Sequence, residues 1–223
     1  MITGSRSTTG FTLIELLAVI CIISLLATLV LTGLNQAQTR MMRTKSLSQF
    51  QQIGMALQAY ASDQDGKLPG PSYTGLNAVY NTSNQSHTIV GLLAPYLGLP
   101  AATASDQIAK VFIPAGFERC YKNPVTRPYM IMTTVPWKSP LWPQHPFGYE
   151  SPVEPSMTIA AVASATSYSG SWIFAELDQG VTAMSSAGWY SQLPKTPPRG
   201  DGARNVLYAD GHVEAIPIKI KFW

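Results

Sequence analysis

Residues 11–34 form a long apolar run near the start of this 223-residue chain. The run reads FTLIELLAVICIISLLATLVLTGL, and its ionisable side chains are the carboxyl group of Glu15 and the thiol of Cys21. As an α-helix it would be about 36 Å long, enough to cross a hydrocarbon layer of about 30 Å. The main rival is a secretory signal peptide, whose apolar region is about 7–15 residues long and normally lacks a carboxylate. The run therefore predicts a membrane-spanning helix.

Glu15 is the residue in this helix that an ordinary membrane anchor does not explain. A carboxylate near the centre of a bilayer costs about 2.5–3.5 kcal/mol, so it needs a partner. Arg6 lies nine residues earlier, outside helical reach. Cleavage after Gly10 would leave an amine on Phe11, which is one helical turn from Glu15. The two groups could pair within one chain, or across two helices packed with an axial offset.

The stretch Gly10-Phe11-Thr12-Leu13-Ile14-Glu15, followed by an apolar helix, resembles the signal of type IV pilins and type II secretion pseudopilins. This resemblance implies cleavage between Gly10 and Phe11 by a prepilin peptidase, which also methylates the new Phe11 amine. It further implies that Glu15 neutralises the amino terminus of a neighbouring subunit during assembly. The expected partners are other pilin-like subunits and an inner-membrane assembly platform with its ATPase.

The charge distribution bears on partners and on orientation. The net charge of +3 is small and scattered, so we expect no nucleic-acid partner. Lys and Arg near the membrane favour the cytoplasmic side, yet Arg6 precedes the apolar run whereas Arg40, Arg43 and Lys45 follow it. Charge alone therefore leaves the orientation ambiguous or reversed. The resemblance places the leader, residues 1–10, in the cytoplasm and the C-terminal domain in the periplasm, with residence in a pseudopilus or surface filament after assembly.

The helical pattern continues beyond the apolar run. Residues 35–66 contain no proline, and apolar side chains recur at three- and four-residue spacing, namely Leu47, Phe50, Ile53, Leu57 and Tyr60. We expect an amphipathic continuation of the same helix that ends near Gly66 and is covered by a soluble α+β domain, residues 67–223.

Five carboxylates are candidates for a calcium site. Asp63 and Asp65 precede Gly66 as at the start of a calcium loop, but Lys67 and Thr74 occupy later ligand positions, so a helix end is the preferred interpretation. Glu176, Asp178 and Asp210 would lie on adjacent strands, where we interpret them as turn and edge residues, with calcium as the alternative. We expect no other cofactor, no catalytic group and no disulfide between Cys21 and Cys120.

The middle of the chain is less informative. Thr88–Leu99 predicts a short helix or turn, and His87 and His145 are interpreted as surface residues. Residues 114–155 are rich in proline and aromatic residues, which disfavours both regular helix and central strand. We expect an ordered loop packed by its rings, with an exposed aromatic patch as the alternative.

Strand patterns dominate the C-terminal third. Residues 171–176 have strand character, and Asp210-Gly211 joins the runs 205–209 and 212–216, which predicts a hairpin with a type I′ turn. RGDGARNVLYADGHV also resembles the His-X9-Asp-Gly motif of a bacterial family of pilin-like proteins. The match covers Asn205, Asp210, Gly211, His212 and Val213, whereas Gly200 stands where that family has histidine. Tyr60-Ala61, Asp63, Gly66 and Leu68-Pro69 resemble the same family.

Together these patterns predict a pilin-like α+β fold. A long N-terminal helix spans the membrane with its first half and packs on a small antiparallel sheet with its second half. The function we expect is that of a structural subunit, not an enzyme, in either a type IV pilus or a type II secretion pseudopilus. The alternative is a single-pass, membrane-anchored periplasmic binding protein or enzyme.

Overall fold

The computed structural model describes Gly10 and residues 12–72, 75–120, 129–131, 144–150, 152–165 and 171–221. Two compact units divide the chain, residues 1–41 and 42–223, and each is described by itself. The sequence placed the start of the soluble domain at residue 67, after the helix ends. In the structure the second unit begins at Met42, because the distal part of the helix contributes to its core.

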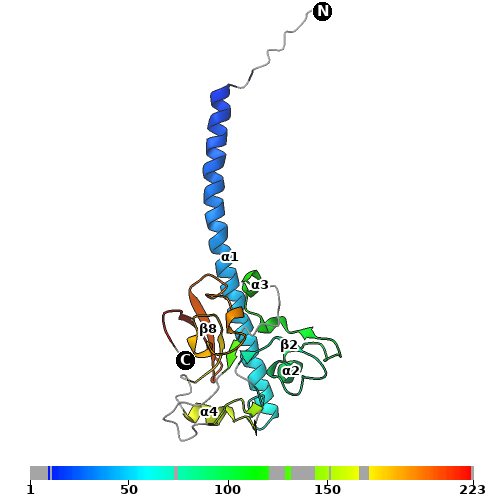
Figure 1. The fold of residues 1–223 in the computed structure, drawn as a ribbon. Helices are drawn as coiled ribbons and strands as arrows, with labels where there is room; N and C mark the ends of the chain where they lie inside the picture. Colours follow the sequence, from blue (N-terminus) through cyan, green and yellow to red (C-terminus); the bar gives the residue numbers. More distant parts are fainter. Residues whose placement is uncertain are drawn as a thin grey trace, which may run out of the picture. The chain divides into compact units, whose positions relative to one another are not determined.

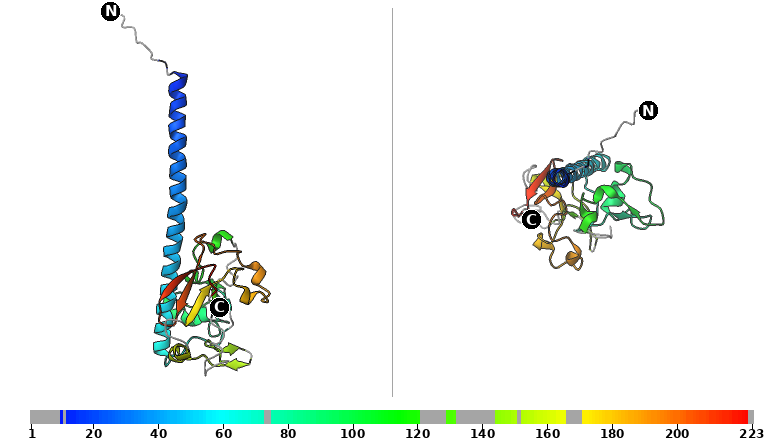
Figure 2. Two further views of the ribbon diagram at one scale, coloured as in Figure 1. Left: turned by 90° about the vertical axis from the view of Figure 1, so that its left-hand side faces the viewer. Right: turned by 90° about the horizontal axis from the view of Figure 1, so that it is seen from above.

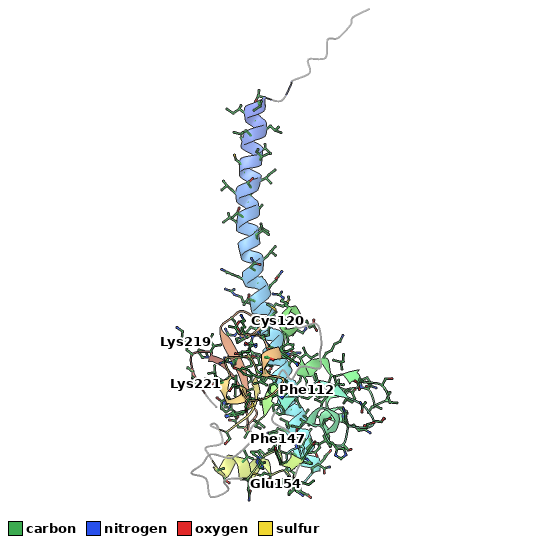
Figure 3. The ribbon with its side chains drawn as sticks, in the orientation of Figure 1. Phe112, Cys120, Phe147, Glu154, Lys219 and Lys221 are labelled. Carbon is green, nitrogen blue, oxygen red and sulfur yellow. The ribbon has the colours of Figure 1, made fainter. Side chains whose placement is uncertain are left out.

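One helix, α1, runs from Leu13 to Asp63. Leucine, alanine, methionine and glutamine are frequent along it and proline is absent, so the local propensity favours a continuous helix. Its first part is apolar on every side, and Figure 3 shows side chains projecting from all around it. The continuous helix predicted from the apolar run and the spacing beyond it is confirmed.

The end of α1 is fixed by backbone geometry. The Gly66 N–H donates to the carbonyl oxygen of Ala61 at 2.7 Å, and Gly66 has a φ of 78°. A glycine in the left-handed region that bonds back to the last helical turn is a common helix end, since it lacks the Cβ that resists positive φ. The helix therefore ends where the sequence predicts.

A five-stranded antiparallel sheet forms the centre of the second unit (Figure 1). Its strands are β1 (Gly75–Leu76), β4 (Tyr129–Ile131), β7 (Trp172–Glu176), β8 (Ala203–Tyr208) and β9 (Val213–Pro217). They are ordered β1-β4-β7-β8-β9, so β7 is central and β9 lies at an edge. In Figure 2 the strands coloured yellow to red lie beside the cyan part of α1.

The core lies where α1 meets this sheet. Phe50, Ile53 and Leu57 are fully or almost fully buried in one cluster with Phe174 of β7 and Leu207 of β8. Gly54 allows α1 to approach β8 closely, because a Cβ atom at this position would lie 3.0 Å from the Leu207 Cδ1 atom. The predicted amphipathic face is therefore the one that packs on the sheet.

Shorter elements complete the second unit. The helices are α2 (Ile89–Leu93), α3 (Phe117–Cys120) and α4 (Ile159–Ala165). The 3-10 turns are η1 (Pro95–Leu97), η2 (Lys110–Phe112), η4 (Thr182–Met184) and η5 (Tyr190–Gln192). Two small antiparallel pairs join β2 (Val79–Tyr80) to β3 (Gln107–Ile108) and β5 (Tyr149–Glu150) to β6 (Val153–Glu154). The Thr88 side chain caps α2 by accepting from the Gly91 N–H at 3.2 Å, which confirms a short helix after Thr88.

Two expectations about strands are wrong. β4 is a central strand inside the stretch 114–155, where the prolines argued against one. It lies in a proline-free window between Pro128 and Pro136, so its N–H groups can join the hydrogen-bond ladder of the sheet.

The aromatic rings of residues 114–155 are described only in part. Phe147 is buried and Tyr149 is half-buried, while Trp137 and Trp142 lie outside the described residues.

The hairpin between β8 and β9 is confirmed, but its turn is not type I′. The Gly211 N–H donates to the Tyr208 carbonyl at 2.9 Å, and Gly211 has a φ of 88°. Asp65 is the only non-glycine with positive φ in the part of the chain that the structure describes, so Asp210 does not adopt the conformation that a type I′ turn requires. The connection is longer than two residues, and its left-handed position falls on Gly211 alone.

Candidate functional site

The amino-terminal end of α1 is held by reciprocal hydrogen bonds between Thr12 and Glu15. The Glu15 Oε2 atom accepts from the Thr12 N–H at 2.9 Å and from the Thr12 hydroxyl at 2.8 Å. The Thr12 Oγ1 atom accepts in turn from the Glu15 N–H at 3.3 Å. This is a capping box, which satisfies N–H groups that a helix start otherwise leaves unpaired.

The capping box gives Glu15 a partner in its own chain. A negative charge in the first helical turn is also favoured by the helix dipole. Thr12 was not among the partners expected for Glu15, although a threonine followed three residues later by glutamate is the known signal of a capping box. Gly10 is exposed, and a Cβ built there would meet no atom within 4 Å. Phe11 lies outside the described residues.

The apolar part of α1 is exposed and is not covered by the other residues that the structure describes. Leu13 is 83% exposed and Leu29 is 70% exposed, and the most apolar window of the helix contains no buried residue. The hydroxyls of Ser24 and Thr28 donate to carbonyl oxygens one turn earlier, at 2.7 and 2.9 Å. Polar groups satisfied inside the helix, with apolar side chains outside, are what a lipid environment requires. By length and composition, this helix can span a membrane.

A buried ion pair joins α1 to the sheet. Arg199 forms an ion pair with Glu176 at the end of β7, and both side chains are almost completely buried. The Ser46 hydroxyl of α1 donates to Glu176 Oε1 at 2.7 Å, and the Asn205 N–H donates to Glu176 Oε2 at 2.8 Å. The Asn205 side-chain amide also donates to Ser46 Oγ at 2.9 Å. Burial raises the pKa of the Glu176 carboxyl group, while Arg199 and these donors act against that rise.

A second buried pair lies alongside. Arg204 of β8 binds Asp178 through Nε at 2.6 Å and Nη2 at 2.8 Å, a two-point contact that suits the planar guanidinium. Glu176 and Asp178 were interpreted as turn and edge residues. This is wrong for Glu176, which ends the central strand β7, but Asp178 does begin a turn, since its carbonyl oxygen accepts from the Val181 N–H at 3.0 Å and its Oδ1 atom accepts from the Gly180 N–H at 2.6 Å. Both carboxylates are also nearly fully buried and paired with arginine, which was not expected. The signal that was missed is the pair of arginines on and next to β8, because a buried carboxylate needs such a partner.

The structure does not gather the calcium candidates around one point. Asp63 accepts from the Tyr96 hydroxyl at 3.0 Å, and Asp65 occupies the left-handed conformation after α1. Asp210 accepts from the His212 N–H at 3.0 Å and contacts the His212 ring nitrogen Nδ1 at 2.5 Å. In the part of the chain that the structure describes, no group of three or more His, Cys, Asp or Glu could hold a metal ion.

Residues of the C-terminal motif take structural positions. Asn205 belongs to the buried ion-pair cluster, and Asp210 with His212 forms the hairpin turn. The His212 ring stacks on Tyr208, with ring centroids 4.2 Å apart. Burial acts to raise the pKa of Asp210, but hydrogen bonds from His212 outweigh it, so the net shift is downward.

His145 has more contacts than a surface residue would need. Its Nδ1 lies 2.5 Å from Glu154 Oε2, and its ring stacks on Tyr149. His145 and Glu154 line a cavity of about 460 Å³, and Ser156 also borders it. No hydrogen bond joins Ser156 to His145 among the described residues, so the three do not form a catalytic triad.

No protein-family model matches this sequence, and the searches of curated proteins and of solved structures also find no match.

Proposed function

We propose that this protein is a structural subunit of a filament, that is, a pilin-like protein or pseudopilin. It is made as a precursor and anchored in the inner membrane by the apolar part of α1, with residues 42–223 in the periplasm. Prepilin peptidase cuts between Gly10 and Phe11 and methylates the new amine. An assembly platform and its ATPase then build the subunits into a type IV pilus or a type II secretion pseudopilus.

One observation carries this proposal: the stretch Gly10–Glu15 leads into α1, whose apolar side chains are not covered by other residues in the described part of the chain. So large an apolar surface must meet either lipid or other proteins. Lipid covers it before assembly, and the same helices of neighbouring subunits cover it afterwards. A plain anchor needs the apolar side chains but not the motif that precedes them.

The capping box fits a two-step role for Glu15. In the single subunit the carboxylate is compensated by Thr12, so the precursor can insert without leaving a bare charge in lipid. In the filament the ammonium of a neighbouring Phe11 replaces the Thr12 hydroxyl as its main partner. The Thr12 hydroxyl only donates a hydrogen bond to the carboxylate, whereas an ammonium also supplies the opposite charge, which counts for more in an apolar bundle, so the exchange favours assembly.

The buried pairs of the second unit support a scaffold role for that unit. Glu176 and Asp178 are both engaged by arginine, so neither carboxylate is available as a general acid or base in this conformation. The Glu176 contacts instead fix the distal part of α1 on β7 and β8 through Ser46 and Asn205. We assign no catalytic reaction to this unit.

The experiment is cell fractionation in the native host, with and without the prepilin peptidase. With the peptidase, part of the protein should be recovered in sheared or pelleted filaments, and all of that part should be processed. Without it, the protein should remain in the inner-membrane fraction at the precursor size. Unprocessed protein in both strains, always in the membrane, would instead favour the membrane-anchored binding protein or enzyme.

A further inference from the structure

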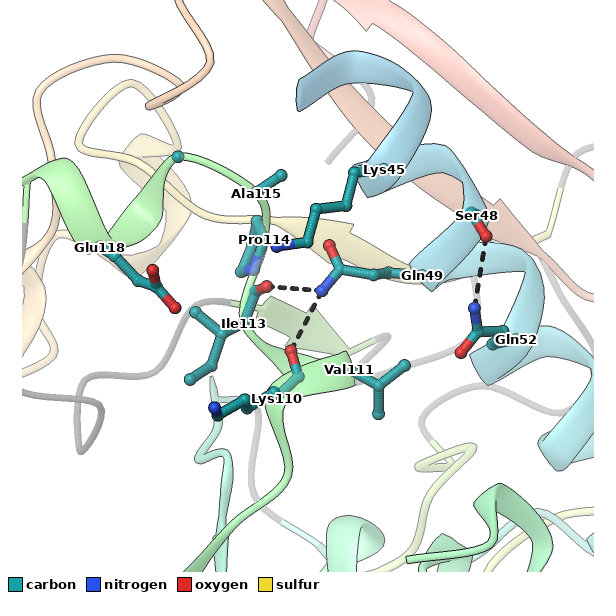
Figure 4. Close-up of a pocket in the computed structure, with 11 residues that line it drawn as sticks. Lys45, Ser48, Gln49, Gln52, Lys110, Val111, Ile113, Pro114, Ala115 and Glu118 are labelled. Carbon is teal, nitrogen blue, oxygen red and sulfur yellow. Dashed lines mark hydrogen bonds between the residues drawn. The ribbon is translucent and has the colours of Figure 1, made fainter. Parts of the chain in front are cut away.

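A polar pocket in the second unit lies between α1 and the segment that contains η2 and the start of α3 (Figure 4). Its volume is about 410 Å³, within the range of small-ligand sites. Lys45, Ser48, Gln49 and Gln52 line it from α1, and Lys110 and Glu118 from the opposite side. Neither the ion-pair clusters nor the proposed assembly helix uses any of these side chains.

Gln49 gives this pocket an unfilled hydrogen-bonding position. Its side-chain nitrogen donates to the carbonyl oxygens of Lys110 at 3.0 Å and Ile113 at 2.9 Å. These two acceptors fix the orientation of the amide, because only the nitrogen can donate to them. The Gln49 Oε1 atom is therefore turned the other way, as Figure 4 shows, and it is buried without a partner among the described residues.

An unpaired buried acceptor is costly, because it has lost its hydrogen bonds to water and gained none within the protein. A ligand that brings an O–H or N–H group to Gln49 Oε1 recovers that cost. A ligand can reach this buried oxygen only if side chains at the pocket shift, and three of those that line it, Lys45, Ser48 and Gln52, are exposed. Exposed side chains change rotamer within nanoseconds, so the oxygen can be reached.

The charges define the other half of the ligand. Lys45 and Lys110 have no ion-pair partner within the described ranges, and both line the pocket. Glu118 contributes one negative charge, and in Figure 4 its carboxylate faces the pocket from the far side. Two ammonium groups and one carboxylate give a net charge of about +1, which favours a monoanion over a doubly charged phosphate ester. Glu118 also offers an acceptor to hydroxyl groups on the same ligand.

We propose that this pocket binds a small monocarboxylate that carries neighbouring hydroxyl groups, as in a sugar acid. The carboxylate lies between Lys45 and Lys110. One hydroxyl donates to Gln49 Oε1, and another donates to Glu118. The ligand can be a free sugar acid or one residue of an acidic polysaccharide, because both present the same groups.

The test is binding of D-glucuronate to the full chain in phosphatidylcholine nanodiscs, measured by saturation-transfer NMR and calorimetry. D-Glucose, which lacks the carboxylate, and acetate, which lacks hydroxyls, should bind at least about tenfold more weakly if both halves of the site contribute. Glucose 6-phosphate is a doubly charged phosphate ester, so it should bind more weakly than D-glucuronate if the pocket prefers a monoanion. A short uronate oligomer that binds more tightly than the monomer identifies a polysaccharide as the source, and equal affinities identify the free acid.

Lys45→Met and Lys110→Met should each weaken D-glucuronate binding by about tenfold, because each removes one charged hydrogen bond. Lys219→Met is the matched control, since Lys219 is exposed and outside the pocket. The unfolding midpoint of the variants should equal that of the parent. The proposal is wrong if no binding is seen at about 10 mM, where a site of about 1 mM would be filled. It is also wrong if the lysine variants bind as the parent does, or if Lys45→Met lowers the unfolding midpoint, since Lys45 would then serve Gln49 within the chain.

Discussion

Glu15 has two partners at different stages in the account proposed here, and substitutions can separate them. Thr12 compensates the carboxylate in the single subunit, through contacts of 2.8 and 2.9 Å. Capping is typically worth about 1 kcal/mol, whereas removing one partner of a buried ion pair costs about 3–5 kcal/mol. The free energies of the two roles therefore differ enough that the amount of protein incorporated into filaments shows which role dominates.

Glu15→Leu should leave the precursor inserted and cleaved but reduce its incorporation into filaments by two or more powers of ten. The physical reason is that the Phe11 ammonium of each subunit would be buried among apolar helices without its counter-charge. The measurement is the fraction recovered in pelleted filaments relative to the fraction processed in the membrane. Thr12→Val is the control, because it removes the capping hydroxyl and keeps the carboxylate. If Glu15→Leu and Thr12→Val are incorporated equally, Glu15 acts only as a helix cap and not as an assembly residue.

Arg199→Met should strongly destabilise residues 42–223. The variant leaves Glu176 buried without its guanidinium, for which a loss of about 3–5 kcal/mol in the free energy of unfolding is typical. Chemical unfolding of the full chain in detergent measures the loss. The double variant Arg199→Met/Glu176→Gln removes both charges and should recover part of it. If Arg199→Met unfolds at the parent's midpoint, the ion pair does not hold α1 on the sheet.

Asp210 should contribute a pH-dependent part of stability. Its pKa is lowered in the folded protein, so the contribution is present above the ordinary value of 3.8 and is lost as the pH falls through the lower folded value. Asp210→Asn should therefore lower the unfolding midpoint near neutral pH, and this difference should shrink as the pH falls below the ordinary value of 3.8. Thermal unfolding of parent and variant across this range checks the sign. A difference that grows toward acid pH would contradict the assignment.

At the scale of single elements, the β8–β9 hairpin depends on Gly211. Its φ of 88° lies in the left-handed region, which costs an L-residue about 1–2 kcal/mol and a β-branched residue more. Gly211→Val should lower the free energy of unfolding by at least that amount, measured on the full chain in detergent. Gly188→Val is the matched control, because Gly188 is exposed, has no positive φ and has open space around its Cα. Similar losses in the two variants would mean that the backbone conformation at Gly211 is not what matters.

The elements differ in how well they can be predicted from their local sequences. α1 has a long apolar run followed by regular spacing, and the β8–β9 hairpin has Asp-Gly between two apolar runs, so both were predicted. β4 has three residues between proline-rich flanks and gains its place only by pairing with β1 and β7, which local sequence does not encode. The predicted turn type was wrong because the dipeptide Asp210-Gly211 indicates a tight turn but does not set the number of residues in it.

The candidate site divides in the same way. Gly10, Phe11 and Glu15 lie within six consecutive residues, so a local motif finds them, and the capping box could have been found from the same six residues. The buried ion pair joins residues that are distant in the chain: Ser46 lies 130 residues from Glu176, and Arg199 lies 23 residues from it. Only the packing of α1 on the sheet brings these groups together. The same holds for Gln49 and the carbonyl oxygens of Lys110 and Ile113.

At the scale of the whole molecule, the two compact units carry different parts of the proposed function. Residues 1–41 contain the motif and the apolar part of α1, whose described side chains are exposed, and residues 42–223 contain the packed domain with its buried ion pairs and its polar pocket. The central claim concerns the first of these, since membrane anchorage alone would not require cleavage after Gly10.

The most direct test is intact-mass and N-terminal peptide mass spectrometry of the protein isolated from its native host. The mature chain should begin at Phe11 and carry a methyl group on its amine, with Gly10 as the last residue removed. Gly10→Val should abolish this processing, because the residue before the cut would gain a branched side chain at an exposed position. Protein that still begins at Met1 while the peptidase is active would contradict the account.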